Sequence, residues 1–251
     1  MNKYLVAFLL LVVYNISAQN NLNIQQLKEG YNTKNKKVFI DNFPNNFKDF
    51  KSTFGWNDKL DKPNVLYSEA NDFIKYFFEL SSSNENCKKK IIKIACKAKW
   101  EADAVNYFHM NLVLLVEKDE NFDKMLQTLD DKDLNDFWRF YFDIENLIYS
   151  QKLYTILNVS MKEKAMFVFN ILKKERSNDS DEHRKLNKYQ IFDKDGYCNL
   201  RKYSNSKSDV IGKIENNEII NVLDNSEDWW FIQTNKGLVG FVHKSRIKIK
   251  N

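Results

Sequence analysis

Apolar side chains recur every three or four positions between residues 38 and 176, the spacing that places them on one face of an α-helix. Ser68 stands where it can cap the first of the stronger helices, and a shorter helix is predicted after Pro44. Glycine and proline are scarce in this part of the chain, which favours helix further. The clearest helical segments are centred on residues 70–80, 91–95, 102–116, 134–141 and 165–172.

Two of these segments have nearly the same sequence. Residues 71–79 (NDFIKYFFE) align with residues 135–143 (NDFWRFYFD), and every position matches in identity or character at an offset of 64 residues. A duplicated unit of two or three helices would explain the match and would give a helical repeat. The alternative is that aromatic-rich amphipathic helices resemble one another by chance.

The pattern changes after residue 189, where short runs of alternating apolar and polar residues are separated by turns. Four of the six glycines lie in this stretch, at turns or strand edges. Runs this short and this evenly spaced predict a small all-β barrel. The fold class is therefore a multidomain α and β chain, with an all-α helical domain followed by the barrel.

The first residues have the features of an export signal. Lys3 is followed by eleven apolar or aromatic residues, Tyr4 to Tyr14, and Ala18 supplies a small residue for cleavage. Eleven helical residues are too short to cross a bilayer core of about 30 Å, and no later segment reaches eighteen apolar residues. We expect a signal peptide at 1–18, a loose N-terminal segment at 19–37, a helical domain at 38–176, a linker at 177–188 and the barrel at 189–251.

The barrel region resembles a known family. Three pieces carry the likeness: Asp195 to Arg201, Val210 to Gly212 with Trp229-Trp230, and Gly240 to Arg246. Their order and spacing resemble the bacterial SH3-type (SH3b) domain over about sixty residues, a quarter of the chain. The resemblance implies a five- or six-stranded barrel that binds peptides or cell-wall material, or packs on a neighbouring domain. It does not imply catalysis.

Charge and cysteine content narrow the classes of partner. The formal net charge of +5 falls to +4 without residues 1–18, which is too small to indicate nucleic-acid binding. Three cysteines, Cys87, Cys96 and Cys198, would remain in an oxidising compartment. On one helix, Cys87 and Cys96 would lie about 13.5 Å apart along the axis, too far for a disulfide. We expect three buried thiols.

Catalytic and metal-binding motifs are absent from the sequence. There is no dinucleotide fingerprint, phosphate-binding loop, HExxH or CxxC, and no cofactor is expected. Asp193 to Gly196 resembles the start of a calcium loop, but the other ligand positions are missing, so a turn is expected instead. A wall peptidase would need a thiolate beside an imidazole, for which Cys96 and His109 are the candidates. A buried thiol and a core histidine are the simpler interpretation.

Binding residues are predicted in the barrel. By the resemblance, Trp229 corresponds to the ligand-facing aromatic of SH3 grooves, yet His243 and Arg246 stand where proline-peptide binders carry Pro and Tyr. That departure argues against a polyproline groove. Packing of Trp229 on the helical domain is the alternative. The predicted ligand-binding residues are Trp229, Tyr203, Asp228, Phe241, His243 and Arg246.

The last residues alternate in character. Lys244, Arg246, Lys248 and Lys250 are separated by Ser245, Ile247 and Ile249, so a strand here would have one basic face. That face would suit an anionic wall polymer or a headgroup surface, or it would simply be a solvated edge strand.

Together these patterns predict an exported, non-enzymatic cell-envelope protein, periplasmic or secreted, whose barrel binds a peptide or peptidoglycan. One alternative is a scaffold in which the barrel is structural and the helices bind another envelope protein. The Cys96–His109 peptidase is the weaker alternative.

Overall fold

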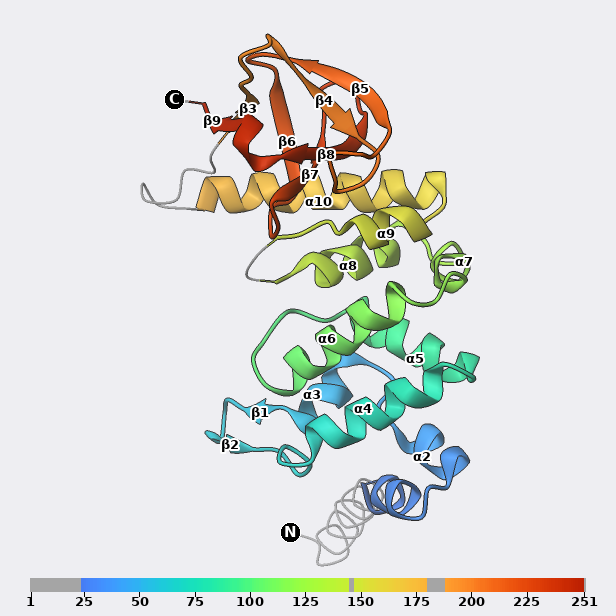
Figure 1. Cartoon of the computed structure of the whole chain (residues 1–251). Helices are drawn as coiled ribbons and strands as arrows, with labels where there is room; N and C mark the ends of the chain where they lie inside the picture. The colour runs from blue at the N-terminus through green and yellow to red at the C-terminus, as the bar shows by residue number, and fades with distance from the viewer. Residues whose placement is uncertain (1–23, 145–146, 180–187, 251) are drawn as a thin grey trace, which may run out of the picture. The chain divides into compact units, whose positions relative to one another are not determined.

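The computed structural model describes residues 24–144, 147–179 and 188–250. The predicted signal peptide, residues 1–18, lies outside the described residues. The chain divides into two compact units with the boundary between Asp119 and Glu120. Helices form the described part of the first unit apart from one short hairpin, and the second combines helices with a β-sheet (Figure 1). A helical region followed by a β-domain was predicted and is confirmed.

The described part of the first unit opens with a helix over residues 24–32, and the predicted loose segment at 19–37 is therefore wrong for these residues. Leu27 and Gly30 are buried on this helix, and the ring of Tyr31 stacks on Phe73 with centroids 4.3 Å apart. The polar composition concealed an apolar stripe at Ile24, Leu27 and Tyr31. The elements that follow are α2 (Lys36–Asn42), α3 (Phe47–Phe54), β1 (Trp56–Asn57), β2 (Lys62–Pro63), α4 (Ala70–Ser81), α5 (Glu85–Ala95) and α6 (Ala104–Val116).

Phenylalanines fill the core of the first unit. Phe43 stacks on Phe77 with ring centroids 3.7 Å apart, and both rings are fully buried. Gly30 allows the first helix to approach α2, because a Cβ there would lie 2.5 Å from the backbone nitrogen of Phe39. The helix predicted after Pro44 is α3. Ser68 does not cap α4 as predicted: its hydroxyl donates to Glu69, the residue at the N-cap.

The second unit contains α7 (Phe122–Leu126), α8 (Asp131–Phe142), α9 (Gln151–Ile156) and α10 (Val159–Asp179) before the sheet. Asp130 caps α8 by accepting from the backbone N–H of Asp133 at 2.8 Å, as its position predicts. The division of the chain differs from the predicted linker at 177–188. Helix α10 continues to Asp179, residues 180–187 lie outside the described residues, and α7 to α10 belong to the same unit as the barrel.

The sheet has seven antiparallel strands in the order β5-β4-β8-β7-β6-β3-β9, rather than the five or six that the resemblance implied. The additional strand is β3, which pairs with both β6 and β9. The strands are β3 (Tyr189–Ile191), β4 (Tyr197–Arg201), β5 (Val210–Glu215), β6 (Ile219–Asp224), β7 (Trp229–Gln233), β8 (Val239–His243) and β9 (Ile247–Ile249).

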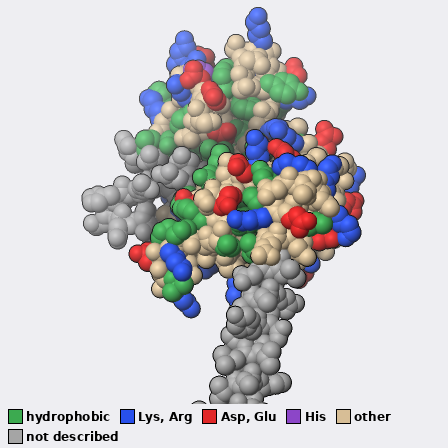
Figure 2. All heavy atoms as spheres, turned by 90° about the horizontal axis from the view of Figure 1, so that it is seen from below, with side chains coloured by type: hydrophobic (Ala, Val, Ile, Leu, Met, Phe, Trp, Pro, Cys, Tyr) green, Lys and Arg blue, Asp and Glu red, His purple; other side chains and the backbone are tan. Residues whose placement is uncertain are grey.

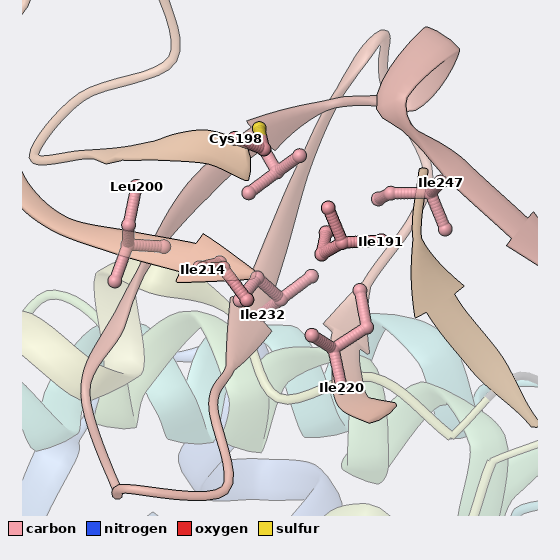
Figure 3. Packing of buried hydrophobic residues seen from close by; sticks show 8 residues of the cluster. Ile191, Cys198, Leu200, Ile214, Ile220, Ile232 and Ile247 are labelled. Carbon is pink, nitrogen blue, oxygen red and sulfur yellow. The ribbon is translucent and has the colours of Figure 1, made fainter. Parts of the chain in front are cut away.

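One aliphatic cluster forms the interior of this barrel (Figure 3). The side chains alternate along each strand, so that Ile232 on β7 and Val242 on β8 point inward and are fully buried. Trp230 and Tyr189 are half-buried at its margin, where their rings meet edge to face at 5.1 Å. The buried members are Ile191, Cys198, Leu200, Ile214, Ile220, Ile232, Val242 and Ile247.

The outer face of β6 and β7 packs on the helices of the same unit. Tyr154 of α9 contacts Phe231 of β7, with ring centroids 5.7 Å apart. The ammonium of Lys173 on α10 donates to Asn221 Oδ1 at 2.6 Å and to the carbonyl of Val222 at 2.9 Å. The barrel therefore uses one face for structural contacts, which leaves other faces for a ligand.

The predicted repeat stays a prediction, and burial adds support to it. Five positions of α4 that are buried, Ala70, Phe73, Ile74, Phe77 and Phe78, correspond at the same offset to five buried positions of α8. Those positions are Leu134, Phe137, Trp138, Tyr141 and Phe142. Each helix also packs on the second helix after it in its own unit, α4 on α6 and α8 on α10.

Candidate ligand pocket

A pocket of about 650 Å³ opens on the barrel, and it lies entirely within the second unit. Its lining is mostly polar, with both signs of charge and two aromatic side chains. The lining residues come from the turn before β4, from β4 itself, from the β4–β5 loop, and from β7, β8 and the turn after β8. They are Asp193, Asp195, Tyr197, Cys198, Asn199, Arg201, Asn205, Ser206, Trp229, His243, Ser245 and Arg246.

Trp229 and His243 form one wall of the pocket. They are directly opposite each other on β7 and β8, and their rings meet edge to face at 5.3 Å. Alternation along β7 turns Trp229 away from the interior that Ile232 fills. His243 Nδ1 accepts from the backbone N–H of Ser245 at 3.3 Å, which fixes the orientation of the imidazole. Both residues were predicted, and half-burial leaves part of each ring accessible.

Arg246 is held in place by a buried carboxylate. Its Nη1 donates to Asp193 Oδ1 at 3.0 Å, and the Asp193 side chain is only 8% exposed whereas that of Arg246 is 41% exposed. Asp193 begins a turn in which the backbone N–H of Asp195 also donates to Asp193 Oδ1, and Gly196 has a positive φ of 82°. The sequence predicted a turn here rather than a calcium loop, and the structure has that turn. The pairing of Asp193 with Arg246, 53 residues apart, left no signal in the sequence.

Arg201 is the second arginine in the pocket, and sequence reasoning missed it. It ends β4 opposite Phe241 of β8, and its Nη1 donates to the carbonyl of Ser208 at 2.7 Å. Gly240 makes this pairing possible, because a Cβ there would lie 2.6 Å from the carbonyl oxygen of Arg201. The glycine and the strand Tyr197–Arg201 were both visible in the sequence, but the pairing of β4 with β8 was not.

Cys198 borders the pocket and also belongs to the barrel interior. Burial raises the pKa of the Cys198 thiol to about 11, and the nearby carboxylate of Asp193 adds to the effect. Because the thiolate is the nucleophilic form, this cysteine is an inert packing residue near neutral pH. Cys87 is also buried, and desolvation raises the pKa of its thiol to about 11 as well.

Three of the predicted binding residues do not line the pocket. Phe241 is buried, and its ring packs on Phe231 with centroids 5.1 Å apart, next to the contact with Tyr154. Tyr203 is half exposed on the β4–β5 loop, where Lys202 lies over its ring. Asp228 pairs with Lys244 at 2.7 Å, and that hydrogen bond lowers the pKa of the Asp228 carboxyl.

The predicted basic face is also wrong in part. Lys244 to Arg246 form a short 3-10 helix (η1) rather than a strand, so side chains two positions apart do not share a face. Lys244 pairs with Asp228 and Arg246 with Asp193, while Lys248 lies over the ring of Phe192. Lys250 follows β9 and is exposed. Both cations of η1 are thus matched by carboxylates.

Cys96 and His109 are core residues of the first unit. Cys96 follows α5 and is 4% exposed, and His109 lies on α6 and is 2% exposed. A peptidase substrate would need access that this burial denies.

Within the described residues, no cluster of His, Cys, Asp and Glu is suited to a metal ion, and no helix is long and apolar enough to cross a membrane. On the face shown in Figure 2, acidic and basic side chains are interleaved.

Comparison with known proteins identifies one region of the chain. The family profile of the bacterial SH3 domain matches residues 194–248, which contain β4 to β8, η1 and part of β9. The predicted SH3-type domain is confirmed, and the match covers all the residues of the pocket except Asp193. No curated protein and no solved structure matches the chain.

Proposed function

We propose that the bacterial SH3 domain of this protein binds a peptide or a peptide-bearing cell-wall component in the pocket beside Trp229. The observation that carries the proposal is the pocket itself. It combines a half-buried tryptophan with polar groups from several strands, so a ligand could stack on the indole ring and form oriented hydrogen bonds with the polar side chains. A bacterial SH3 domain suggests a cell-wall or peptide-binding role, which agrees with this composition.

The polar side chains of the pocket support recognition of a peptide backbone. Asn199, Asn205, Ser206 and Ser245 supply amide and hydroxyl groups along its lining. Amides and hydroxyls both donate and accept hydrogen bonds, so they suit the alternating N–H and C=O groups of a peptide. Trp229 would then cover one side of the bound segment.

The compartment belongs to the same proposal. Residues 1–18 have the charged start, apolar run and small residue of an export signal, and an exported chain would meet the cell wall. Mass spectrometry of the protein purified from the envelope fraction tests this directly. We expect a mature N-terminus at Gln19, whereas retention of Met1 in a cytoplasmic pool would contradict it.

Co-sedimentation with purified sacculi tests the binding. The mature chain, residues 19–251, is expected to sediment with sacculi, and Trp229→Ala is expected to remain in the supernatant. Tyr203→Ala is the matched control, because Tyr203 is an exposed aromatic of the same domain that lies outside the pocket. Failure of the unmodified chain to sediment, or equal sedimentation of both variants, would contradict the proposal.

A structural barrel is the second candidate, and one observation favours it. Phe231, which packs on Phe241, is buried beside Tyr154 of α9, and Lys173 of α10 is bonded to β6, so the domain is firmly attached to the helices. A scaffold of this kind would bind its partner elsewhere. This candidate would be supported if Trp229→Ala pulled down envelope proteins as efficiently as the unmodified chain does, and if the unmodified chain did not sediment with sacculi.

A further inference from the structure

The pocket holds two guanidinium groups whose orientation is already set. Arg201 and Arg246 each use Nη1 for a hydrogen bond inside the domain, to the Ser208 carbonyl and to the Asp193 carboxylate. Within the described residues, Nε and Nη2 of these two side chains donate no hydrogen bond, so these donors remain for a ligand. Planar guanidinium groups match the two oxygens of a carboxylate.

The pocket also holds one carboxylate that is not used internally. Asp193 is consumed by Arg246 and by the backbone N–H of Asp195. The Asp195 side chain is exposed and forms no hydrogen bond or ion pair within the described residues, although it lines the same pocket. An ammonium group of a ligand would find its counter-charge there.

The charges of the lining balance one another. Arg201 and Arg246 are matched in number by Asp193 and Asp195. A lining without net charge does not favour a polyanion such as a phosphate-rich wall polymer over other ligands. It does favour a molecule that carries both signs.

We infer that the ligand is a zwitterionic peptide, with a carboxylate bound by Arg201 and Arg246 and an ammonium group next to Asp195. This inference rests on the proposed function, since it names the chemistry of the ligand in the same pocket. Arg246 and the backbone N–H of Asp195 both donate to Asp193 Oδ1, so the carboxylate and the ammonium group of the ligand would lie close together, in a pocket that Trp229 also lines.

Chemical modification of the ligand tests the inference without changing the protein. The probes are peptides released from sacculi by an amidase, used untreated, with their carboxylates converted to methylamides, or with their amines acetylated. Binding to the full mature chain is followed by NMR, through the indole N–H resonance of Trp229. This resonance is assigned by its loss in Trp229→Phe. We expect amidation to weaken binding at least tenfold and acetylation to weaken it several-fold. Equal binding of the amidated peptides would overturn the inference and leave peptide binding intact.

Co-sedimentation with intact sacculi separates this failure from failure of the proposed function. If the protein binds sacculi but none of the three peptide preparations shifts the Trp229 signal, the ligand is not a zwitterionic peptide. The inference then fails, and the proposed function stands. If neither sacculi nor peptides bind, the proposed function fails with it.

The variant Asp195→Asn gives a second test, because whether it weakens or strengthens binding depends on the charge of the ligand. Removing this negative charge is expected to weaken the binding of a zwitterionic peptide about three- to tenfold, whereas it would strengthen the binding of a polyanion. Asp209→Asn is the matched control, since Asp209 is exposed in the same domain and lies outside the pocket. Stronger sacculus binding by Asp195→Asn, with Asp209→Asn unchanged, would overturn the inference in favour of an anionic polymer.

Discussion

Lys173 gives a quantitative test of how the barrel is attached to the helices. Its ammonium lies between α10 and β6, bonded to the Asn221 amide oxygen and the Val222 carbonyl. Burial lowers the pKa of Lys173 from its ordinary value of 10.5 to about 8. The folded second unit therefore releases this proton at a lower pH than the unfolded chain does.

The sign and size of the effect follow from proton linkage. Between pH 8 and pH 10.5 the unfolded chain binds the proton and the folded chain does not, so the free energy of unfolding rises with pH. At about 1.4 kcal/mol per pH unit the full rise is about 3 kcal/mol, of which about 2 kcal/mol is reached by pH 9.5. Below pH 7 Lys173 is protonated in both states and contributes no slope.

Urea unfolding of the intact chain and of Lys173→Met measures this rise as a difference between the two proteins, so that other titrating groups cancel. Replacing Trp56 and Trp100 with Phe in both proteins confines the tryptophan fluorescence to the second unit. Asn221→Asp is the matched variant: a carboxylate beside the ammonium should raise the pKa of Lys173 and remove the rise. A difference that stays constant from pH 7 to pH 9.5 would refute the reasoning.

Three further predictions concern stability and thiol reactivity. Trp230→Ala should lower the free energy of unfolding by about 2 kcal/mol in urea titrations, less than for a fully buried tryptophan because Trp230 is half-buried; no loss would contradict its packing on the barrel interior. Asp130→Ala should cost about 1 kcal/mol through loss of the α8 cap, and an unchanged transition midpoint would be the contrary result. Iodoacetamide at pH 8 should leave Cys87 and Cys198 unmodified in the folded chain and modify both in urea, because burial raises the pKa of each thiol to about 11; rapid labelling of the folded protein would contradict this burial.

Local patterns predicted the elements of the fold well. The helical spacing of residues 70–80 and 134–141 corresponds to α4 and α8, and the alternation after residue 189 corresponds to the barrel strands. These patterns are visible because each records burial of one face of a single element. The helix over residues 24–32 was missed because only three apolar residues, set among polar ones, define its buried face.

Contacts between distant segments could not be predicted from the same patterns. The sequence predicted Trp229, His243 and Arg246, which line the pocket, because the family resemblance pointed to all three and strand alternation also pointed to Trp229. Arg201 and Asp193 join them only through the pairing of β4 with β8 and an ion pair across 53 residues. Phe241 was misplaced because alternation gives a face but not what covers it, here Phe231 beside Tyr154.

Direct measurement of ligand affinity at the pocket tests the central claim. Soluble fragments of purified sacculi are titrated into the mature chain, Trp229→Ala and Tyr203→Ala, and the melting temperature of each protein is recorded in parallel. Loss of a stacked aromatic typically costs about 2 kcal/mol of binding free energy, roughly a thirtyfold weakening. We predict that weakening for Trp229→Ala with an unchanged melting temperature, and unchanged affinity for Tyr203→Ala. A lowered melting temperature with unchanged affinity in Trp229→Ala would make Trp229 a packing residue and would contradict the claim.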